Sequence, residues 1–119
     1  MTVLLVEDNA KNMKLLRDVL TAKGYDVLEA ASGEEAVALA ADELPQLVLM
    51  DVQLPGIDGV AALRRVRADA RTAAIPVLAL TAQAMEGDRE RFLAAGFDGY
   101  LSKPVDIVEL VETVAAYVS

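Results

Sequence analysis

The sequence alternates five short apolar runs with segments of helical spacing, and this alternation limits the fold more than any other feature. The runs lie at residues 3–6, 27–30, 47–50, 77–80 and 100–102. Runs this short are typical of strands that are buried on both faces of a sheet. Strands that alternate with helices are joined by right-handed crossovers, which produce a parallel sheet. We therefore predict an α/β fold, with a doubly wound parallel sheet of five strands and five helices on both of its faces.

The segments between the apolar runs carry the capping residues of helices. Helices are predicted over residues 10–23, 32–41, 58–66, 86–95 and 106–118. The expected N-caps of four of them are Asn9, Ser32, Asp58 and Asp106. Gly24 follows the first helix, Pro45 stops the second, and Gly96 is expected to end the fourth in the left-handed conformation.

Composition narrows the class of protein and the chemistry that it can perform. The 119 residues, 55% hydrophobic and 25% charged, are expected to form one folded domain over 1–119. No apolar run is long enough to cross a membrane, and we expect a soluble protein of the cytoplasm with no membrane contact. A net charge of -8 argues against direct binding of nucleic acid. The chain contains no Cys and no His, so its chemistry is limited to carboxylate, hydroxyl and amine groups.

Polar residues follow four of the five predicted strands. The first run is followed by Glu7 and Asp8, the third by Asp51, the fourth by Thr81, and the fifth by Lys103. Ligands of doubly wound sheets bind beyond the carboxyl ends of the strands, where the strand order reverses. In the flavodoxin-like order 2-1-3-4-5, that point lies between the first and third strands. We therefore expect these polar residues to meet at one edge of the sheet.

Three carboxylates that converge on a partly desolvated site repel one another, unless a cation joins them or one takes up a proton. An all-oxygen set of ligands suits Mg²⁺, which commonly binds one or two carboxylates together with phosphate oxygens. Lys103 would supply a positive charge, and Thr81 a hydroxyl donor, for an incoming anion. An Asp carboxylate can attack phosphorus to form an aspartyl phosphate. The hypothesis is that Asp51 is phosphorylated.

Each of these residues also has an ordinary structural interpretation. Asp51 alone would more often open a loop or cap a helix. Glu7 and Asp8 alone would be acids beside a helix N-terminus, and Thr81 alone would be a hydroxyl cap. The functional interpretation is favoured because the residues are expected at one edge of one sheet.

Four segments of the sequence together resemble the receiver domains of two-component response regulators. They read VEDN at 6–9, LMDVQLPGIDG at 49–59, ALTA at 79–82 and YLSKP at 100–104. The resemblance covers essentially the whole chain and implies the CheY-like form of the flavodoxin-like fold. The residues at 7–9, 12–15, 82–85 and 87–88 are most similar to the single-domain DivK-like regulators.

The resemblance implies roles for the residues of the acidic edge. Asp51 would be the phosphoacceptor, with Mg²⁺ as the cofactor. Asp8 and Asp51 would bind the metal directly, Glu7 would act mostly through a metal-bound water, and the main-chain carbonyl of Gln53 would complete the protein ligands. The side chains of Gln53 and Gln83 occupy the positions with which the family tunes hydrolysis of the acyl phosphate.

The resemblance also implies a conformational switch. Thr81 and Lys103 would bind the phosphoryl group, and with Asp51 they would form the catalytic set. Lys103 would be joined to Pro104 by a cis peptide bond. Tyr100 matches the aromatic switch position, which turns inward as Thr81 moves toward the phosphoryl group. That movement would remodel the surface of the fourth helix, fifth strand and fifth helix.

The implied partners are a sensor histidine kinase or a histidine phosphotransfer protein, and a downstream protein that the sequence does not identify. The chain would be a signalling switch whose only enzymatic activities are its own phosphorylation and dephosphorylation. It would be a monomer or a weak, phosphorylation-dependent dimer. No residues remain after the fifth predicted helix for an output domain, so output would pass through a partner.

Three alternatives stay open. The chain could be a receiver excised from a larger regulator or a hybrid kinase. It could be a degenerate receiver that works only as a binding module, although its acids, Thr81 and Lys103 are intact. It could be a haloacid-dehalogenase-like phosphatase, an enzyme class that places a second Asp two residues after the nucleophile, where this chain has Gln53.

Overall fold

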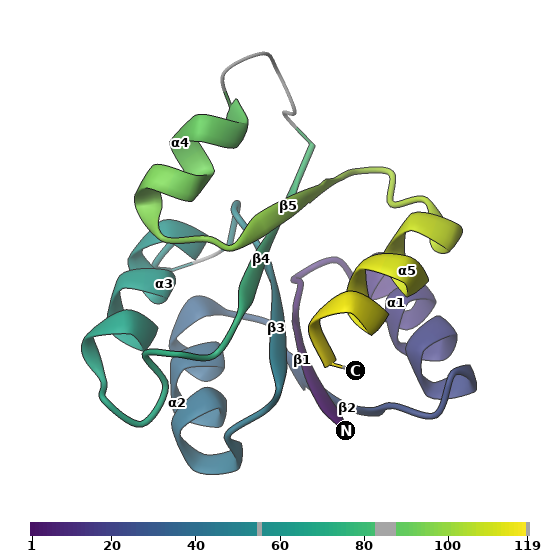
Figure 1. Ribbon diagram of the computed structural model, residues 1–119, viewed down its shortest axis with the longest axis horizontal. Helices are drawn as coiled ribbons and strands as arrows, with labels where there is room; N and C mark the ends of the chain where they lie inside the picture. The colour runs from purple at the N-terminus through teal and green to yellow at the C-terminus, as the bar shows by residue number, and fades with distance from the viewer. Residues whose placement is uncertain (55, 83–87, 119) are drawn as a thin grey trace.

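The computed structural model describes residues 1–54, 56–82 and 88–118. Within these residues the strands are β1 (Thr2–Val6), β2 (Asp26–Ala30), β3 (Leu47–Asp51), β4 (Val77–Thr81) and β5 (Gly99–Ser102). The helices are α1 (Ala10–Ala22), α2 (Gly33–Glu43), α3 (Gly59–Ala68), α4 (Asp88–Ala95) and α5 (Ile107–Val118). The strands form one parallel sheet in the order β2-β1-β3-β4-β5 (Figure 1). The predicted fold class and strand order are therefore confirmed.

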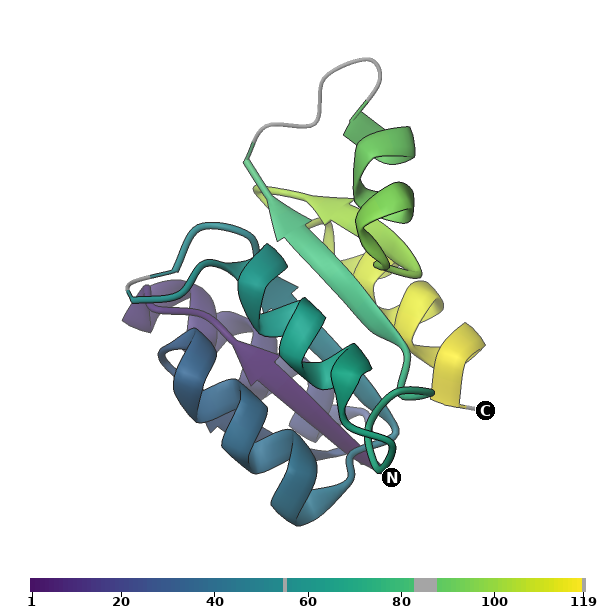
Figure 2. The same cartoon turned by 90° about the vertical axis from the view of Figure 1, so that its left-hand side faces the viewer.

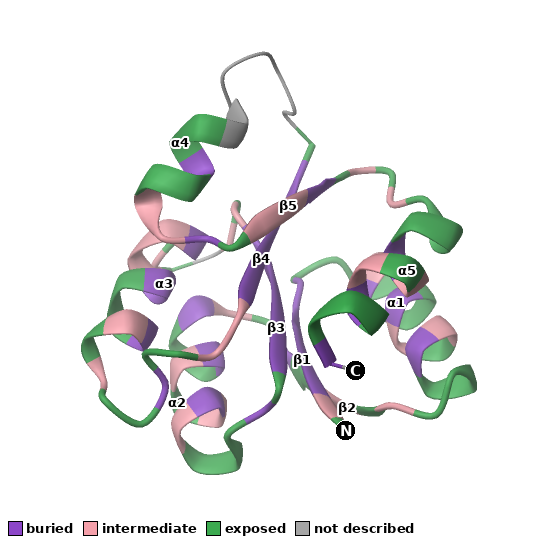
Figure 3. Ribbon diagram, viewed as in Figure 1, coloured by how far each residue is buried: buried purple, intermediate pink, exposed green. Residues whose placement is uncertain are grey.

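Helices cover both faces of the sheet, so that the central strands are buried between two apolar layers. Helices α1 and α5 pack on one face, and α2, α3 and α4 pack on the other (Figures 1 and 2). Successive residues of β3 alternate between the layers: Leu47 and Leu49 contact the α1 and α5 side, and Val48 and Met50 contact the opposite side. Every residue of β3 and β4 is buried (Figure 3).

The four predicted N-caps are confirmed, because each of these side chains accepts a hydrogen bond from a backbone N–H in the first turn of its helix. Gly24 and Gly96 both have positive φ angles, of 91° and 113°. Helix α2 runs two residues further than predicted, to Glu43, and Leu44 ends it in the left-handed conformation, with a φ of 47°, immediately before Pro45. The predicted start of the fourth helix, at residue 86, lies outside the described residues.

Among the residues that the structure describes, no helix combines the length and the apolar character that a bilayer span requires.

Candidate functional site

The acidic residues meet where β1 and β3 end. Because Val6 pairs with Met50 in the parallel register, Glu7, the first residue after β1, lies beside Asp51, the last residue of β3. One carboxylate oxygen from each of Glu7, Asp8 and Asp51 lies within 4.8 Å of the others. Glu7 and Asp51 are 2% and 5% exposed, whereas Asp8 is exposed. The predicted convergence of the three acids is thus present.

The ammonium group of Lys103 joins two of these acids. Its Nζ atom lies 2.6 Å from Glu7 Oε2 and 2.7 Å from Asp51 Oδ2. Burial alone would lower the pKa of Lys103, but its hydrogen bonds to Asp51 and Glu7 outweigh burial and raise the pKa above its usual value. Burial, with a contribution from the charge of Asp51, raises the pKa of Glu7. Lys103 therefore acts as a counter-ion within the cluster.

Backbone groups hold the acids in place. The Gln53 N–H donates a 2.9 Å hydrogen bond to Asp51 Oδ1, and the Asn9 N–H donates a 3.2 Å bond to Glu7 Oε1. Gly59, the first residue of α3, lies so close to the Asp51 carbonyl that a Cβ atom added there would be 2.4 Å from that oxygen. The orientation of the Asp51 carboxylate is therefore set by Gln53 on one oxygen and by Lys103 on the other.

The acids open into a cavity of about 290 Å³. It is lined by Glu7, Asp8, Asn9, Asn12, Asp51, Gln53, Ala82 and Lys103. The lining residues carry three carboxylates, three side-chain amides and one ammonium group. Carboxylate and amide oxygens suit Mg²⁺, and the ammonium group suits an anion beside it. The residues present therefore fit a magnesium ion.

Thr81 lies at the same edge but is not among the residues that line this cavity. It ends β4, next to β3, and is 5% exposed. Its carbonyl accepts a 2.7 Å hydrogen bond from the Lys103 N–H, so the two predicted phosphoryl-binding residues are joined through their backbones. The peptide bond from Lys103 to Pro104 is cis, as the resemblance implied.

Two asparagines that line the cavity, Asn9 and Asn12, were not predicted as members of the site. From the sequence, Asn9 is identified as a helix cap and as part of the segments that resemble receiver domains, and Asn12 only as part of such a segment. A usable signal does exist, because residues three apart on a helix share a face, and Asn12 follows the capping Asn9 by three. Gln83, the second predicted tuning residue, lies outside the described residues.

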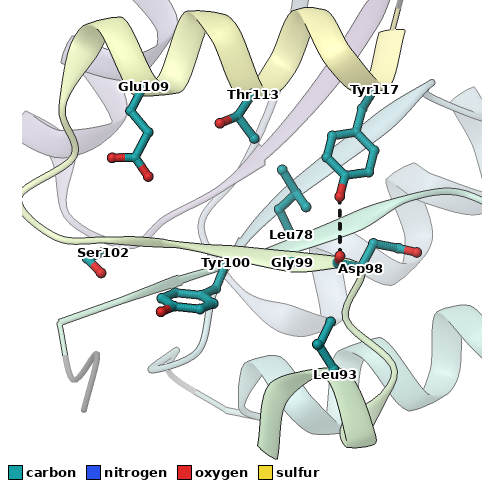
Figure 4. A pocket seen from close by; sticks show the side chains of 9 residues that line it. All are labelled: Leu78, Leu93, Asp98, Gly99, Tyr100, Ser102, Glu109, Thr113 and Tyr117. Carbon is teal, nitrogen blue, oxygen red and sulfur yellow. Dashed lines mark hydrogen bonds between the residues drawn. The ribbon is translucent and has the colours of Figure 1, made fainter. Parts of the chain in front are cut away.

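Tyr100 lies away from the acids, in a second hollow of about 400 Å³ between α4, β5 and α5 (Figure 4). It is partly buried, and its ring centroid is 6.0 Å from that of Phe92. On the α5 side of this hollow, the Tyr117 hydroxyl donates a 3.2 Å hydrogen bond to the Asp98 carbonyl (Figure 4). Tyr100 pairs with Ala79 on β4, two residues before Thr81. Strand β4 therefore lies between the strand that carries Tyr100, β5, and the strand that carries Asp51, β3.

Comparison with known proteins identifies the class to which this fold and site belong. Residues 3–115 match the family described as the response regulator receiver domain, and the chain belongs to that family.

Individual relatives agree with this assignment. The chain is 43% identical to the polar-differentiation response regulator DivK of Brucella ovis, over 98% of this chain and 94% of that protein. Its structure is similar to the receiver domain of a sensor histidine kinase from Pseudomonas aeruginosa, with a TM-score of 0.90 and 40% identity over 98% and 95% of the two chains. That domain has a magnesium ion coordinated in its active site cleft. A CheY chemotaxis protein of Vibrio cholerae gives a TM-score of 0.91 at 28% identity, over 98% of each chain.

Proposed function

We propose that this chain is the phosphoacceptor of a two-component phosphotransfer reaction and that Asp51 accepts the phosphoryl group. The observation that carries the proposal is the environment of the Asp51 carboxylate. It is buried, it is oriented by Gln53 N–H and Lys103 Nζ, and it opens into a cavity that contains two further acids. A fixed carboxylate beside a positive charge has the geometry that nucleophilic attack on phosphorus needs.

The proposed cofactor is Mg²⁺, which when bound would neutralise charge on the phosphoryl oxygens. Asp8 and Asp51 would hold it directly, together with the main-chain carbonyl of Gln53, and Glu7 would act through a water molecule. Three acids against one ammonium leave the cluster with excess negative charge, and this excess favours a divalent cation. The magnesium in the cleft of the Pseudomonas aeruginosa receiver supports this choice.

The proposed donor is a phosphohistidine on a sensor kinase or a phosphotransfer protein, and this partnership implies a cytoplasmic location. One oxygen of Asp51 attacks phosphorus. A P–O bond forms, the P–N bond breaks, and the imidazole leaves with the bonding electrons and takes up a proton. In the second half of the cycle, water attacks phosphorus, the bond between phosphorus and the Asp51 oxygen breaks, and inorganic phosphate leaves while the carboxylate is restored. Lys103 stabilises the transferred group, because its ammonium already lies 2.7 Å from Asp51 Oδ2.

We further propose that residues 1–119 act as one receiver domain that switches a protein-binding surface. The Thr81 hydroxyl would bind the phosphoryl group, and Tyr100 would turn inward behind it. Thr81 ends β4 and Tyr100 lies on the neighbouring strand β5, and the hollow that contains Tyr100 lies between α4, β5 and α5 (Figure 4). Phosphorylation would shift an existing equilibrium between two packings of this region toward one of them.

The test is incubation with acetyl phosphate and Mg²⁺, followed by the intact mass of the protein. We expect one phosphoryl group on the wild type and none on the Asp51→Asn variant. The matched control is Asp58→Asn, which makes the same charge change in an exposed N-cap where Asn is an equally good cap. The proposal is wrong if the wild type gains no mass or if the Asp51→Asn variant gains as much. Steady release of phosphate from a small phosphate ester would favour the phosphatase alternative.

A further inference from the structure

The loop between β3 and α3 is held from outside by the first turn of α2. The Ile57 N–H donates a 2.7 Å hydrogen bond to Glu34 Oε1, which comes from a residue 23 positions earlier in the chain. Glu34 is exposed and Ile57 is partly buried. This carboxylate is therefore bonded to the loop that follows the proposed phosphoacceptor.

Two glycines show how closely the two segments fit. Gly56 has a φ of +73°, and a Cβ atom added there would lie 2.6 Å and 2.7 Å from the two carboxylate oxygens of Glu34. A Cβ atom added at Gly33 would lie 2.6 Å from Ile57 Cγ1 and 2.7 Å from the Ile57 carbonyl oxygen. Since real Cβ atoms do not approach other atoms this closely, only glycine allows both contacts in this arrangement.

The other end of the same loop belongs to the acidic site. Gln53, two residues after Asp51, donates its N–H to Asp51 Oδ1. The loop closes where the Gly59 N–H donates a 3.0 Å hydrogen bond to the Val52 carbonyl. Only residues 52–58 lie between β3 and α3, so the position of Ile57 limits the positions that Gln53 can adopt.

We infer that Glu34 is a positioning residue for the Asp51 site. It fixes the loop whose Gln53 N–H orients Asp51 and whose Gln53 carbonyl is a proposed metal ligand, without touching any reacting group itself. The inference rests on the proposed function, because it gives Glu34 a part in Mg²⁺ binding and phosphoryl transfer at that site.

The test compares Glu34→Ala with Glu34→Gln in the full chain. Both variants remove one negative charge, so they change the electrostatic field of the acidic cluster equally. Glu34→Gln retains a carbonyl oxygen that can accept from the Ile57 N–H, whereas Glu34→Ala does not. A difference between the two variants therefore reports the hydrogen bond rather than the charge. Urea denaturation of both variants checks that each is folded.

The first readout is amide hydrogen exchange and chemical shift by NMR in the metal-free protein. In Glu34→Ala we expect faster exchange at Ile57 together with a shifted Gln53 amide, and in Glu34→Gln we expect values close to the wild type. Changes confined to Ile57 would overturn the inference, because Glu34 would then hold only its own neighbour.

The second readout is a MgCl₂ titration followed by the same amide resonances. Outer groups that orient metal ligands typically change affinity by about tenfold to a hundredfold. Because Glu34 acts through the backbone, we expect a smaller effect than that range: a Mg²⁺ dissociation constant about threefold to tenfold higher in Glu34→Ala, and within about twofold of the wild type in Glu34→Gln. Phosphorylation of Glu34→Ala by acetyl phosphate should be slow at low Mg²⁺ and should recover at saturating Mg²⁺.

The outcomes separate the inference from the function on which it rests. If the wild type binds Mg²⁺ and is phosphorylated while Glu34→Ala behaves identically, the inference alone is wrong. Equal weakening in Glu34→Ala and Glu34→Gln would also overturn it, since charge would then explain the effect. If the wild type neither binds Mg²⁺ nor accepts a phosphoryl group, the proposed function fails and the role of Glu34 fails with it.

Discussion

Replacing Asp8 with Asn should make the metal-free protein more stable, although the substitution removes a proposed metal ligand. Asp8 lies within 4.8 Å of the carboxylates of Glu7 and Asp51. The charges of Glu7, Asp51 and Lys103 sum to one net negative charge, so Asp8 is repelled by about one charge at that distance. Relief of this repulsion is expected to stabilise the folded state.

The magnitude follows from Coulomb's law. Two unit charges 4.8 Å apart repel by about 0.9 kcal/mol at the dielectric constant of water and by about 3.5 kcal/mol at an effective value of roughly 20. Asp8 is exposed, so about 1.5 kcal/mol is a suitable value between these limits. An acid just before a helix contributes about 0.5 kcal/mol through the helix dipole, and Asn loses this contribution. We therefore expect Asp8→Asn to raise the free energy of unfolding by about 1 kcal/mol.

Urea denaturation in EDTA at low ionic strength measures this difference, with Asp26→Asn as a control that makes the same charge change at the exposed start of β2. The gain should shrink as NaCl is added, because salt screens exposed charges. Mg²⁺ at ten times its dissociation constant should stabilise the wild type by roughly 1.4 kcal/mol and the variant by much less, so the order of stability should reverse. The reasoning is refuted if Asp8→Asn is less stable than the wild type in EDTA, or if Mg²⁺ stabilises both proteins equally.

Other substitutions test the same cluster. Lys103→Met leaves the buried Glu7 and Asp51 without their ammonium partner and should lower the free energy of unfolding in EDTA by about 2 kcal/mol, as measured in urea; an unchanged value would contradict the role of Lys103 as counter-ion. Since the pKa of Lys103 is raised above 10.5, its stabilisation should be fully present below pH 10.5 and lost as the pH rises through the higher folded-state pKa, and Lys103→Met should show no such loss. The pKa of Glu7 is raised above 4.5, so ionised Glu7 destabilises the fold at neutral pH. This cost should shrink as the pH falls through the raised pKa and be gone below pH 4.5, and a Glu7→Gln variant that kept the full dependence would show that another group is responsible. Gly59→Ala should destabilise the protein by about 1–3 kcal/mol, because the new Cβ atom would lie 2.4 Å from the Asp51 carbonyl and 2.8 Å from Val52 Cα; thermal unfolding at the wild-type temperature would argue against this close contact.

The fold could be predicted because its signals are local. Asn9 and Asp58 cap helices through bonds to backbone groups two or three residues away, and the runs at 3–6, 47–50 and 77–80 are uniformly apolar. The boundaries were less accurate where the determining contacts are distant. Strand β1 begins at Thr2 because that residue pairs with Asp26 on β2, and no pattern within residues 1–6 carries this information.

The convergence of the acids could likewise be predicted, because the strand order alone brings the ends of β1 and β3 together. Two features of the site could not. From the sequence, Lys103 is expected to bind an incoming anion. In the structure its ammonium group forms hydrogen bonds to Glu7 and Asp51 instead, and which partner it contacts depends on how far its long side chain reaches. The bond from Ile57 to Glu34 depends on the path of a loop past a neighbouring helix, which residue spacing does not encode.

The most direct test of the central claim is the position of the phosphoryl group on the chain. Borohydride reduction converts an aspartyl phosphate to homoserine, and mass spectrometry of the resulting peptides locates the converted residue. After phosphorylation with Mg²⁺, we predict homoserine at position 51 and at no other aspartate, and none when EDTA replaces Mg²⁺. Conversion at Asp8 or Asp58 with Asp51 intact would contradict the account.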